Sequence, residues 1–261
     1  MERMRLDVYL SKHGYFHSRE KAKQALAEKR IYVNHLLAEQ GKYLVQEQDE
    51  ITILPSSDHY VGRGAWKLKH ALEVFQLSLA DAVVLDVGAS TGGFTQVCLE
   101  AGARLVYALD VGKDQLDPSL RKDLRVVVME QRNFRYAQSD WFDHSFDFIC
   151  ADVSFISLKH IIPQLRLLMQ EDACAVLLVK PQFEAGPSYV NKHGVVKDQK
   201  AHILVLQEIT ACAKAHGLHV RGLIPSPIHG KDGNIEYLLY LSLFAANAAL
   251  DIPHVVTHAF K

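Results

Sequence analysis

The 261-residue sequence has no excess of either charge. Its 29 Lys and Arg residues face 30 Asp and Glu residues, which leaves a formal net charge of −1. A chain coated in basic residues is therefore excluded, and any contact with nucleic acid must come from a local patch. Hydrophobic residues make up 49% and charged residues 23% of the chain, so a disordered protein is excluded as well.

Cysteine is scarce and unclustered. The four cysteines, Cys98, Cys150, Cys174 and Cys212, lie far apart and form no CxxC pair. This spacing argues against a zinc ribbon and against a disulfide framework. We therefore expect reduced thiols in the core of a cytoplasmic protein, and no metal site.

Long hydrophobic runs are also missing. The N-terminal MERMRLD is charged and is not followed by the apolar segment of a secretion signal. The longest late uncharged run, Tyr237 to Leu250, has 14 residues, whereas a membrane helix needs about 20. We expect neither a signal peptide nor a membrane span.

The first part of the chain has the pattern of a small α+β domain. Apolar residues recur at three- and four-residue spacing from Arg5 to Ala27, which predicts two short helices separated at Gly14, with Ser18 as the N-cap of the second. Two β-like runs follow, at 30–33 and 50–54. The stretch Pro55-Ser56-Ser57-Asp58 then predicts a linker, so we assign 1–57 to one domain and 58–261 to another.

The second part alternates between strand and helix. After a helix at 65–75, the pattern predicts strands at 82–87, 104–110, 124–129, 146–152 and 173–180, with helices at 92–102, 158–170 and 198–216. Apolar strands separated by helices indicate a doubly wound, Rossmann-like parallel sheet. Runs at 218–224 and 235–244 have no helix between them, so we expect the sheet to end in an antiparallel hairpin.

A glycine-rich turn is the strongest local motif. The segment VLDVGASTGGF, residues 84–94, is an apolar strand that leads through glycines 88, 92 and 93 into a helix. Such a turn lets the backbone approach a ligand at the helix N-terminus. It could hold the phosphates of a dinucleotide, but Ser90-Thr91 stands where a GxGxxG turn has a glycine. Asp110 ends the next strand, where its carboxylate can accept hydrogen bonds from ribose hydroxyls.

Several motifs together resemble one known family. The segments LDVGASTGGFT, YALDVG, RVVVMEQRNFR, ADVSFISL, LVKPQFEAG, GVVKD and PSPIHGKDGNIEYL, in this order, resemble the TlyA family, which is named haemolysin but comprises ribosomal RNA 2'-O-methyltransferases related to FtsJ. The resemblance implies S-adenosylmethionine as cofactor. It implies a cofactor site made of Asp86, Gly88, Ala89, Ser90, Thr91, Gly92, Gly93, Phe94, Asp110 and Asn133.

The resemblance also implies a catalytic tetrad. FtsJ-like enzymes use a Lys-Asp-Lys-Glu set, and the matching motifs supply Lys67 in GRGAWKL, Asp152 in ADVSF, Lys180 in LVKPQF and Glu236 in GNIEYL. A ribose hydroxyl is a poor nucleophile until its proton is removed. We expect Lys180 to accept or relay that proton. Whether its amine is neutral when the reaction occurs is left open.

The N-terminal segments RLDVYL, SREKAKQAL and RIYVN resemble the RNA-binding fold of ribosomal protein S4 and of pseudouridine synthases. Six basic residues face only two acidic ones between positions 12 and 30, and this excess can meet phosphates. The predicted RNA-binding residues are Lys12, Arg19, Lys21, Lys23, Lys29 and Arg30. His35 departs from the family, which usually has glycine after the asparagine of this turn.

The resemblance implies 2'-O-methylation of a cytidine in ribosomal RNA, with the RNA or a ribosomal subunit as partner and folded RNA recognised by its shape. Two alternatives belong to other classes: a non-catalytic RNA-binding assembly factor and a membrane-active haemolysin. Retention of the tetrad speaks against the first, and the lack of an apolar span speaks against the second. Four residues expected on loops near the catalytic edge are given no definite role: Glu184, Lys192, Lys197 and Lys231.

Overall fold

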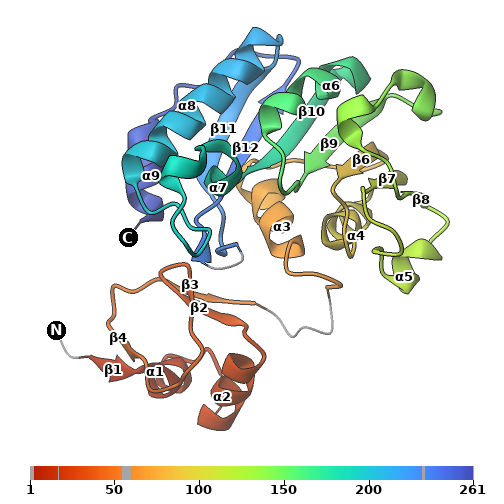
Figure 1. The fold of residues 1–261 in the computed structure, drawn as a ribbon. Coiled ribbons are helices and arrows are strands. Elements are labelled where there is room, and N and C mark those ends of the chain that lie inside the picture. Colours follow the sequence, from red (N-terminus) through yellow and green to blue (C-terminus); the bar gives the residue numbers. More distant parts are fainter. Residues whose placement is uncertain (1–2, 17, 55–59, 231–232, 261) are drawn as a thin grey trace.

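A computed structural model shows a small N-terminal module beside a larger sheet with helices on both faces (Figure 1). The structure describes residues 3–16, 18–54, 60–230 and 233–260. The predicted linker and the domain boundary within it lie outside the described residues, as does Lys231. The boundary between 57 and 58 therefore stays a prediction.

The N-terminal module consists of two helices and short strands. Its elements are β1 (Met4–Arg5), α1 (Leu6–Lys12), α2 (Arg19–Ala27), β2 (Ile31–Val33), β3 (Leu36–Leu37), β4 (Leu44–Val45) and β5 (Ile51–Ile53). The Ser18 hydroxyl accepts the Lys21 backbone N–H at 3.3 Å, which confirms the predicted N-cap of α2. The apolar faces of both helices pack on β2 and form a separate small core around Leu6, Leu10 and Leu26.

The turn between β2 and β3 has an unusual second residue. Asn34 and His35 have φ values of 49° and 64°, as the central residues of a type I′ hairpin turn do. Asn34 suits its position, because its side chain bonds to the Asp49 carboxylate and to the Glu50 backbone N–H. Glycine would adopt the second conformation without strain, whereas the His35 backbone is strained there.

The large sheet contains the predicted parallel strands and the predicted hairpin. Its strand order is β11-β12-β10-β9-β6-β7-β8. The bounds are β6 (Val83–Val87), β7 (Leu105–Leu109), β8 (Val126–Met129), β9 (Phe146–Ala151), β10 (Met169–Val179), β11 (His219–Pro225) and β12 (Tyr237–Ser242). The hairpin does not simply extend the edge, because β12 lies between β10 and β11 and is antiparallel to both. The first residues of β12 thus lie where the parallel strands end.

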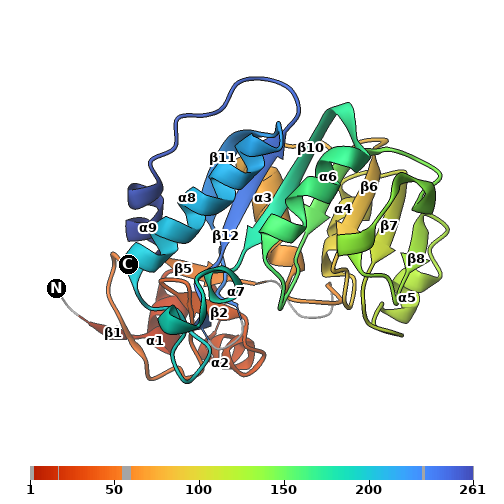
Figure 2. The same cartoon turned by 45° about the horizontal axis from the view of Figure 1, so that its top comes forward.

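Helices cover both faces of this sheet (Figure 2). Apolar residues of α3 (Ala65–Val74), α4 (Gly93–Glu100) and α5 (Pro118–Arg121) pack in one core. Those of α6 (Ile162–Leu168), α8 (Gln199–Ala215) and α9 (Ile252–Ala259) pack in the other. The remaining helical turns are α7 (Pro181–Glu184), η1 (Phe134–Tyr136), η2 (Ser139–Trp141), η3 (Leu158–His160) and η4 (Pro187–Tyr189). Within the described ranges, none of the helices combines the length and apolar character that crossing a membrane requires.

Two elements differ from the expected ones. The helix expected at 158–170 is split into η3 and α6, and β10 begins at Met169, four residues early, where it pairs with Phe146 before a register shift. Sequence periodicity does not reveal α9. This helix starts where the Asp251 carboxylate accepts the His254 backbone N–H, and it buries only Val256 and Ala259.

The two modules contact each other through a small apolar cluster. Tyr32 and Leu54 of the N-terminal module are buried against Ile228, with Trp66 packed beside them. Arg63, just before α3, donates to the Tyr32 hydroxyl at 2.6 Å and to the His229 carbonyl at 3.2 Å. These contacts hold β2 close to the beginning of α3.

Candidate active site

The catalytic candidates meet at one edge of the large sheet. Asp152 follows β9 and Lys180 follows β10, so both lie where parallel strands end. Glu236 precedes β12 and reaches the same edge because that strand runs in the opposite direction. Lys67 comes from the first turn of α3, which packs over this edge. The fold thus brings together four residues separated by up to 169 positions in sequence.

The four side chains form a chain of alternating charge. Lys67 Nζ lies 2.7 Å from a Glu236 carboxylate oxygen and 3.8 Å from Asp152 Oδ2. Asp152 Oδ1 lies 2.5 Å from Lys180 Nζ, which also donates to the Ser154 hydroxyl at 2.9 Å. Lys67, Glu236 and Lys180 are only 7, 3 and 9% exposed. Buried charges need partners, so each of these side chains can stay buried and charged only while its neighbours remain in place.

Mutual attraction outweighs burial in this chain. Burial by itself would lower the pKa of Lys67, but the charges of Asp152 and Glu236 raise that pKa above its ordinary value. Burial would raise the pKa of Asp152, yet Lys67 and Lys180 lower it. Both groups are therefore charged around neutral pH, and Asp152 is an acceptor held between the two lysines.

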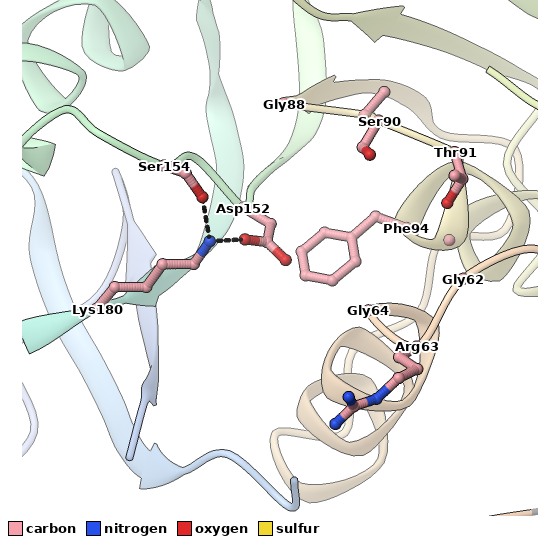
Figure 3. A pocket seen from close by; sticks show the side chains of 12 residues that line it. Gly62, Arg63, Gly64, Gly88, Ser90, Thr91, Phe94, Asp152, Ser154 and Lys180 are labelled. Carbon is pink, nitrogen blue, oxygen red and sulfur yellow. Dashed lines mark hydrogen bonds and ion pairs between the residues drawn. The ribbon is translucent and has the colours of Figure 1, made fainter. Parts of the chain in front are cut away.

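A cavity of about 310 Å³ lies directly beside the tetrad (Figure 3). One wall is the glycine turn after β6, a second is the backbone just before α3, and a third is formed by Asp152, Ser154 and Lys180. Its complete lining is Gly62, Arg63, Gly64, Gly88, Ala89, Ser90, Thr91, Gly93, Phe94, Asp152, Ser154 and Lys180. Seven of the ten predicted cofactor residues belong to the glycine turn, and six of those seven line this cavity.

Gly88 cannot be replaced without rearranging the turn. Its φ is 82°, and a Cβ atom there would lie 2.6 Å from the backbone oxygen of Asp152. Gly92, with φ 98°, is in the left-handed region too, and a Cβ there would overlap the side chain of Leu120. Gly92 is the one residue of the turn that does not line the cavity, and its left-handed backbone lets α4 begin.

The remaining predicted cofactor residues lie outside the cavity wall. Asp110 accepts the backbone N–H of Ser90 at 2.8 Å and that of Gly112 at 2.7 Å, so it holds the glycine turn. Asn133 accepts the Arg135 backbone N–H and begins η1. Both have solvent-accessible surface, and a carboxylate retains further acceptor positions after two hydrogen bonds.

Asp86 is completely buried beneath the turn. Its Oδ2 accepts the Thr95 hydroxyl at 2.7 Å, whereas Oδ1 has no hydrogen-bond partner among the described residues. Burial raises the pKa of Asp86 to about 7, against the lowering effect of the Thr95 hydrogen bond. Asp86 therefore joins β6 to α4 and supports the turn from behind.

Sequence reasoning missed several residues at this edge. Phe155 is 91% exposed, has φ 62°, and its ring centroid lies 5.0 Å from that of Phe183. Glu184, considered for RNA contact, instead accepts the Ser157 hydroxyl at 2.6 Å and the Leu158 backbone N–H at 2.8 Å. It thereby fixes the loop that carries Phe155. The motif ADVSFISL contains these loop residues, but a motif does not show which side chain faces solvent.

The predicted RNA-binding residues fall into two groups. Lys12, Lys21, Lys23 and Lys29 are exposed on the helical side of the N-terminal module. Arg19 instead pairs with the buried Asp7 at 2.8 Å. Arg30 is mostly buried and donates to the Leu54 carbonyl and to Glu28, both at 2.8 Å. The two arginines thus hold the module together, whatever else they contact. Lys192 and Lys197 are exposed near η4.

Comparisons with known proteins agree with this arrangement. Residues 60–243 match the family model described as FtsJ-like methyltransferase, and residues 4–51 match the S4 domain. The chain is 40% identical, over 92% of its length and 90% of the relative's, to the 16S/23S rRNA (cytidine-2'-O)-methyltransferase TlyA of Mycobacterium tuberculosis. It is 37% identical, over 91% of its length and 99% of the relative's, to Hemolysin A of Brachyspira hyodysenteriae.

A solved structure has the same overall fold. A haemolysin-named protein of Streptococcus thermophilus superposes with a TM-score of 0.76 and 41% sequence identity, covering 99% of this chain and 96% of that one. The resemblance inferred from the motifs is therefore confirmed, and the chain belongs to the FtsJ-like methyltransferase family, with an S4 domain preceding the methyltransferase domain.

Proposed function

We propose that this protein transfers a methyl group from S-adenosylmethionine to the ribose 2'-hydroxyl of a cytidine in ribosomal RNA. One observation carries the proposal: a cavity bounded by the glycine turn ends at the buried chain Glu236–Lys67–Asp152–Lys180. A place for a methyl donor and a place for proton handling are thus adjacent. The named activity of the Mycobacterium tuberculosis relative supports ribosomal RNA as the substrate.

The cavity suits S-adenosylmethionine in size and in chemistry. At about 310 Å³ it is within the range of small-molecule sites, roughly 300–1,000 Å³. Bound there, the cofactor would supply an electrophilic methyl group on a positively charged sulfur. The Asp152 carboxylate and the Phe94 ring line the cavity and favour a cation. Gly88 leaves room for close backbone approach, and Asp110 has acceptor positions for ribose hydroxyls.

Lys180 is the residue that we assign to the proton of the 2'-hydroxyl. Its Nζ is held between Asp152 and Ser154 at the cavity wall, so its position is defined before substrate arrives. Lys67, which is itself held by Glu236, lies 3.8 Å from the other oxygen of Asp152 and helps to keep that carboxylate in place. To act as the base, Lys180 must first release its own proton to solvent. The neutral amine would then accept the proton of the hydroxyl while the hydroxyl oxygen bonds to the methyl carbon and the bond from that carbon to the cofactor sulfur breaks.

The RNA would reach this site across the N-terminal module. We assign phosphate contacts to the exposed lysines of α1, α2 and the turn after α2, since Arg19 and Arg30 already have protein partners. Phe155 presents a nearly free aromatic ring beside the catalytic edge, on which an unstacked base can stack. We place this reaction in the cytoplasm, on ribosomal RNA or a ribosomal subunit.

The decisive experiment is methyl transfer to defined RNA. Purified protein is incubated with radiolabelled S-adenosylmethionine and ribosomal RNA or isolated subunits, and the modified nucleoside is identified by mass spectrometry after nuclease digestion. We expect 2'-O-methylcytidine. Label on a base instead of a ribose would refute the proposed chemistry, and transfer only to protein would refute the substrate.

A further inference from the structure

Two histidines and a glutamate converge where the modules meet. His35 lies in the β2–β3 turn, Glu50 precedes β5, and His258 is on the last turn of α9. One ligand atom from each of the three lies within 4.8 Å of the others, and His35 Nε2 is 3.5 Å from a Glu50 carboxylate oxygen. The three residues are spread over most of the chain, so their spacing in sequence does not reveal this cluster.

A third histidine adjoins the cluster from the segment between β11 and β12. The ring centroid of His229 lies 6.3 Å from that of His35, with the two rings nearly parallel. His229 is only 9% exposed, and within the described part of the chain its ring nitrogens make no hydrogen bond of ordinary geometry, only a weaker contact with the Gly233 backbone. Nδ1 of the buried His35 lacks a hydrogen-bond partner among the described residues. Buried polar atoms are nearly always paired, so the unpaired Nδ1 of His35 beside the poorly paired His229 ring indicates a missing partner.

Neither stability nor catalysis explains the cluster. His35 occupies a positive-φ position at which glycine would fold without strain, so the imidazole is retained at a conformational cost. The contact between His35 and Glu50, at 3.5 Å, is long for a strong ion pair, and Glu50 is more than half exposed. The catalytic tetrad uses none of these residues.

The donor set matches a transition-metal ion. Imidazole nitrogen with carboxylate oxygen is typical of Zn²⁺ sites, whereas Ca²⁺ and Mg²⁺ prefer oxygen alone. With Zn²⁺ bonds of about 2.0 Å, tetrahedral ligand atoms lie about 3.3 Å apart. The ligand atoms must therefore approach one another by up to about 1.5 Å, which the exposed side chains of Glu50 and His258 can allow. A cavity of about 210 Å³ lies nearby, and its lining includes His229 and the sequence neighbours of two ligands, Asn34 and Ala259.

We propose that His35, Glu50 and His258 bind one Zn²⁺ ion, with His229 or water as the fourth ligand, and that this ion fastens the N-terminal module to α9. The three ligands come from distant parts of the sequence, so the site forms only when the chain is folded. We also expect Zn²⁺ to stabilise the full-length protein by holding two distant parts of the chain together.

The test uses full-length protein that has been freed of metal with EDTA. Zn²⁺ binding is measured by competition with a chromogenic chelator, and thermal unfolding is followed with and without ZnCl₂. We expect one Zn²⁺ per chain and, at 100 times the dissociation constant, a midpoint about 5–10 °C higher. Mg²⁺ at the same concentration should have no comparable effect. No RNA or S-adenosylmethionine is present, so the result is independent of the proposed methyl transfer.

Two variants locate the site, and one serves as a matched control. His35→Gly suits the turn and His258→Ala suits a helix, so both should fold while Zn²⁺ affinity falls at least 100-fold. His254→Ala removes an exposed histidine one turn earlier on α9 and should bind as the wild type does. The visible absorption of bound Co²⁺ checks for tetrahedral coordination. Wild-type protein that binds no Zn²⁺, or affinity unchanged in His35→Gly and His258→Ala, would overturn the proposal.

Discussion

The catalytic edge and the helical side of the N-terminal module are both rich in charged residues, but those at the edge are buried and paired whereas those on the module are exposed. At the edge, each of the four tetrad side chains contacts the next in space, from Glu236 through Lys67 and Asp152 to Lys180. Each charge therefore depends on its neighbours. On the module, the lysines of α1 and α2 are exposed, and their charges can act separately. Paired buried charges suit a reaction step, whereas separate exposed charges suit a polyanion. Substitutions at the catalytic edge should therefore change the reaction rate or stability, whereas substitutions of the exposed lysines should change RNA affinity by a smaller amount.

The largest effect is expected at Lys180. Lys180→Ala should lower single-turnover methyl transfer by about 10²–10⁴-fold, the usual contribution of acid–base catalysis, while affinity for S-adenosylmethionine stays nearly unchanged. Lys180→Arg keeps the charge beside Asp152 but cannot accept a proton, and so should be equally impaired. Single-turnover transfer of labelled methyl at saturating enzyme and cofactor measures both. A nearly normal rate for the arginine variant would leave Lys180 with a purely electrostatic role.

The next effect concerns stability and its pH dependence. Because the pKa of Asp86 is raised to about 7 in the folded protein, the folded state holds a proton that the unfolded state releases near pH 4. Stability should therefore fall as pH rises from about 4 to 7 and then level off, by up to about 4 kcal/mol at roughly 1.4 kcal/mol per unit. Asp86→Asn should flatten this slope while keeping an acceptor for Thr95.

Urea unfolding of Asp86→Asn at several pH values checks this expectation. The slope is the readout, since an amide N–H₂ without a partner can shift the stability at every pH by a constant amount. Asp114→Asn, at an exposed position, is the control and should retain the wild-type slope. If Asp86→Asn also retains it, the buried carboxyl is not the group that titrates.

The sheet could be predicted from sequence because apolar periodicity and glycine turns are local signals. The positions of Asp152 and Lys180 follow from it, since both come directly after parallel strands. The meeting of Glu236 with Lys67 could not be derived in this way, because it depends on β12 inserting between β10 and β11. The partners of Arg30 and the cluster around His35 are likewise long-range contacts. Local patterns show where a strand ends, but not which distant side chains meet there.

The smallest effect is expected on RNA affinity, when the exposed lysines of the N-terminal module are replaced. Lys12, Lys23 and Lys29 have no ion pair within the described ranges, so replacing all three by glutamine should leave folding and S-adenosylmethionine affinity intact. If each meets one phosphate, the slope of log affinity against log salt should fall by about 2, at roughly 0.7 per contact on single-stranded RNA. Binding to ribosomal RNA, measured over a salt series, gives that slope. The matched control replaces the exposed Lys122, Lys200 and Lys214, which changes net charge equally. If both variants lose the same RNA affinity, RNA binding depends on the overall charge and not on this face. If only the N-terminal variant loses affinity, and its methyl-transfer rate is unchanged at saturating RNA, these lysines contribute to binding and not to catalysis.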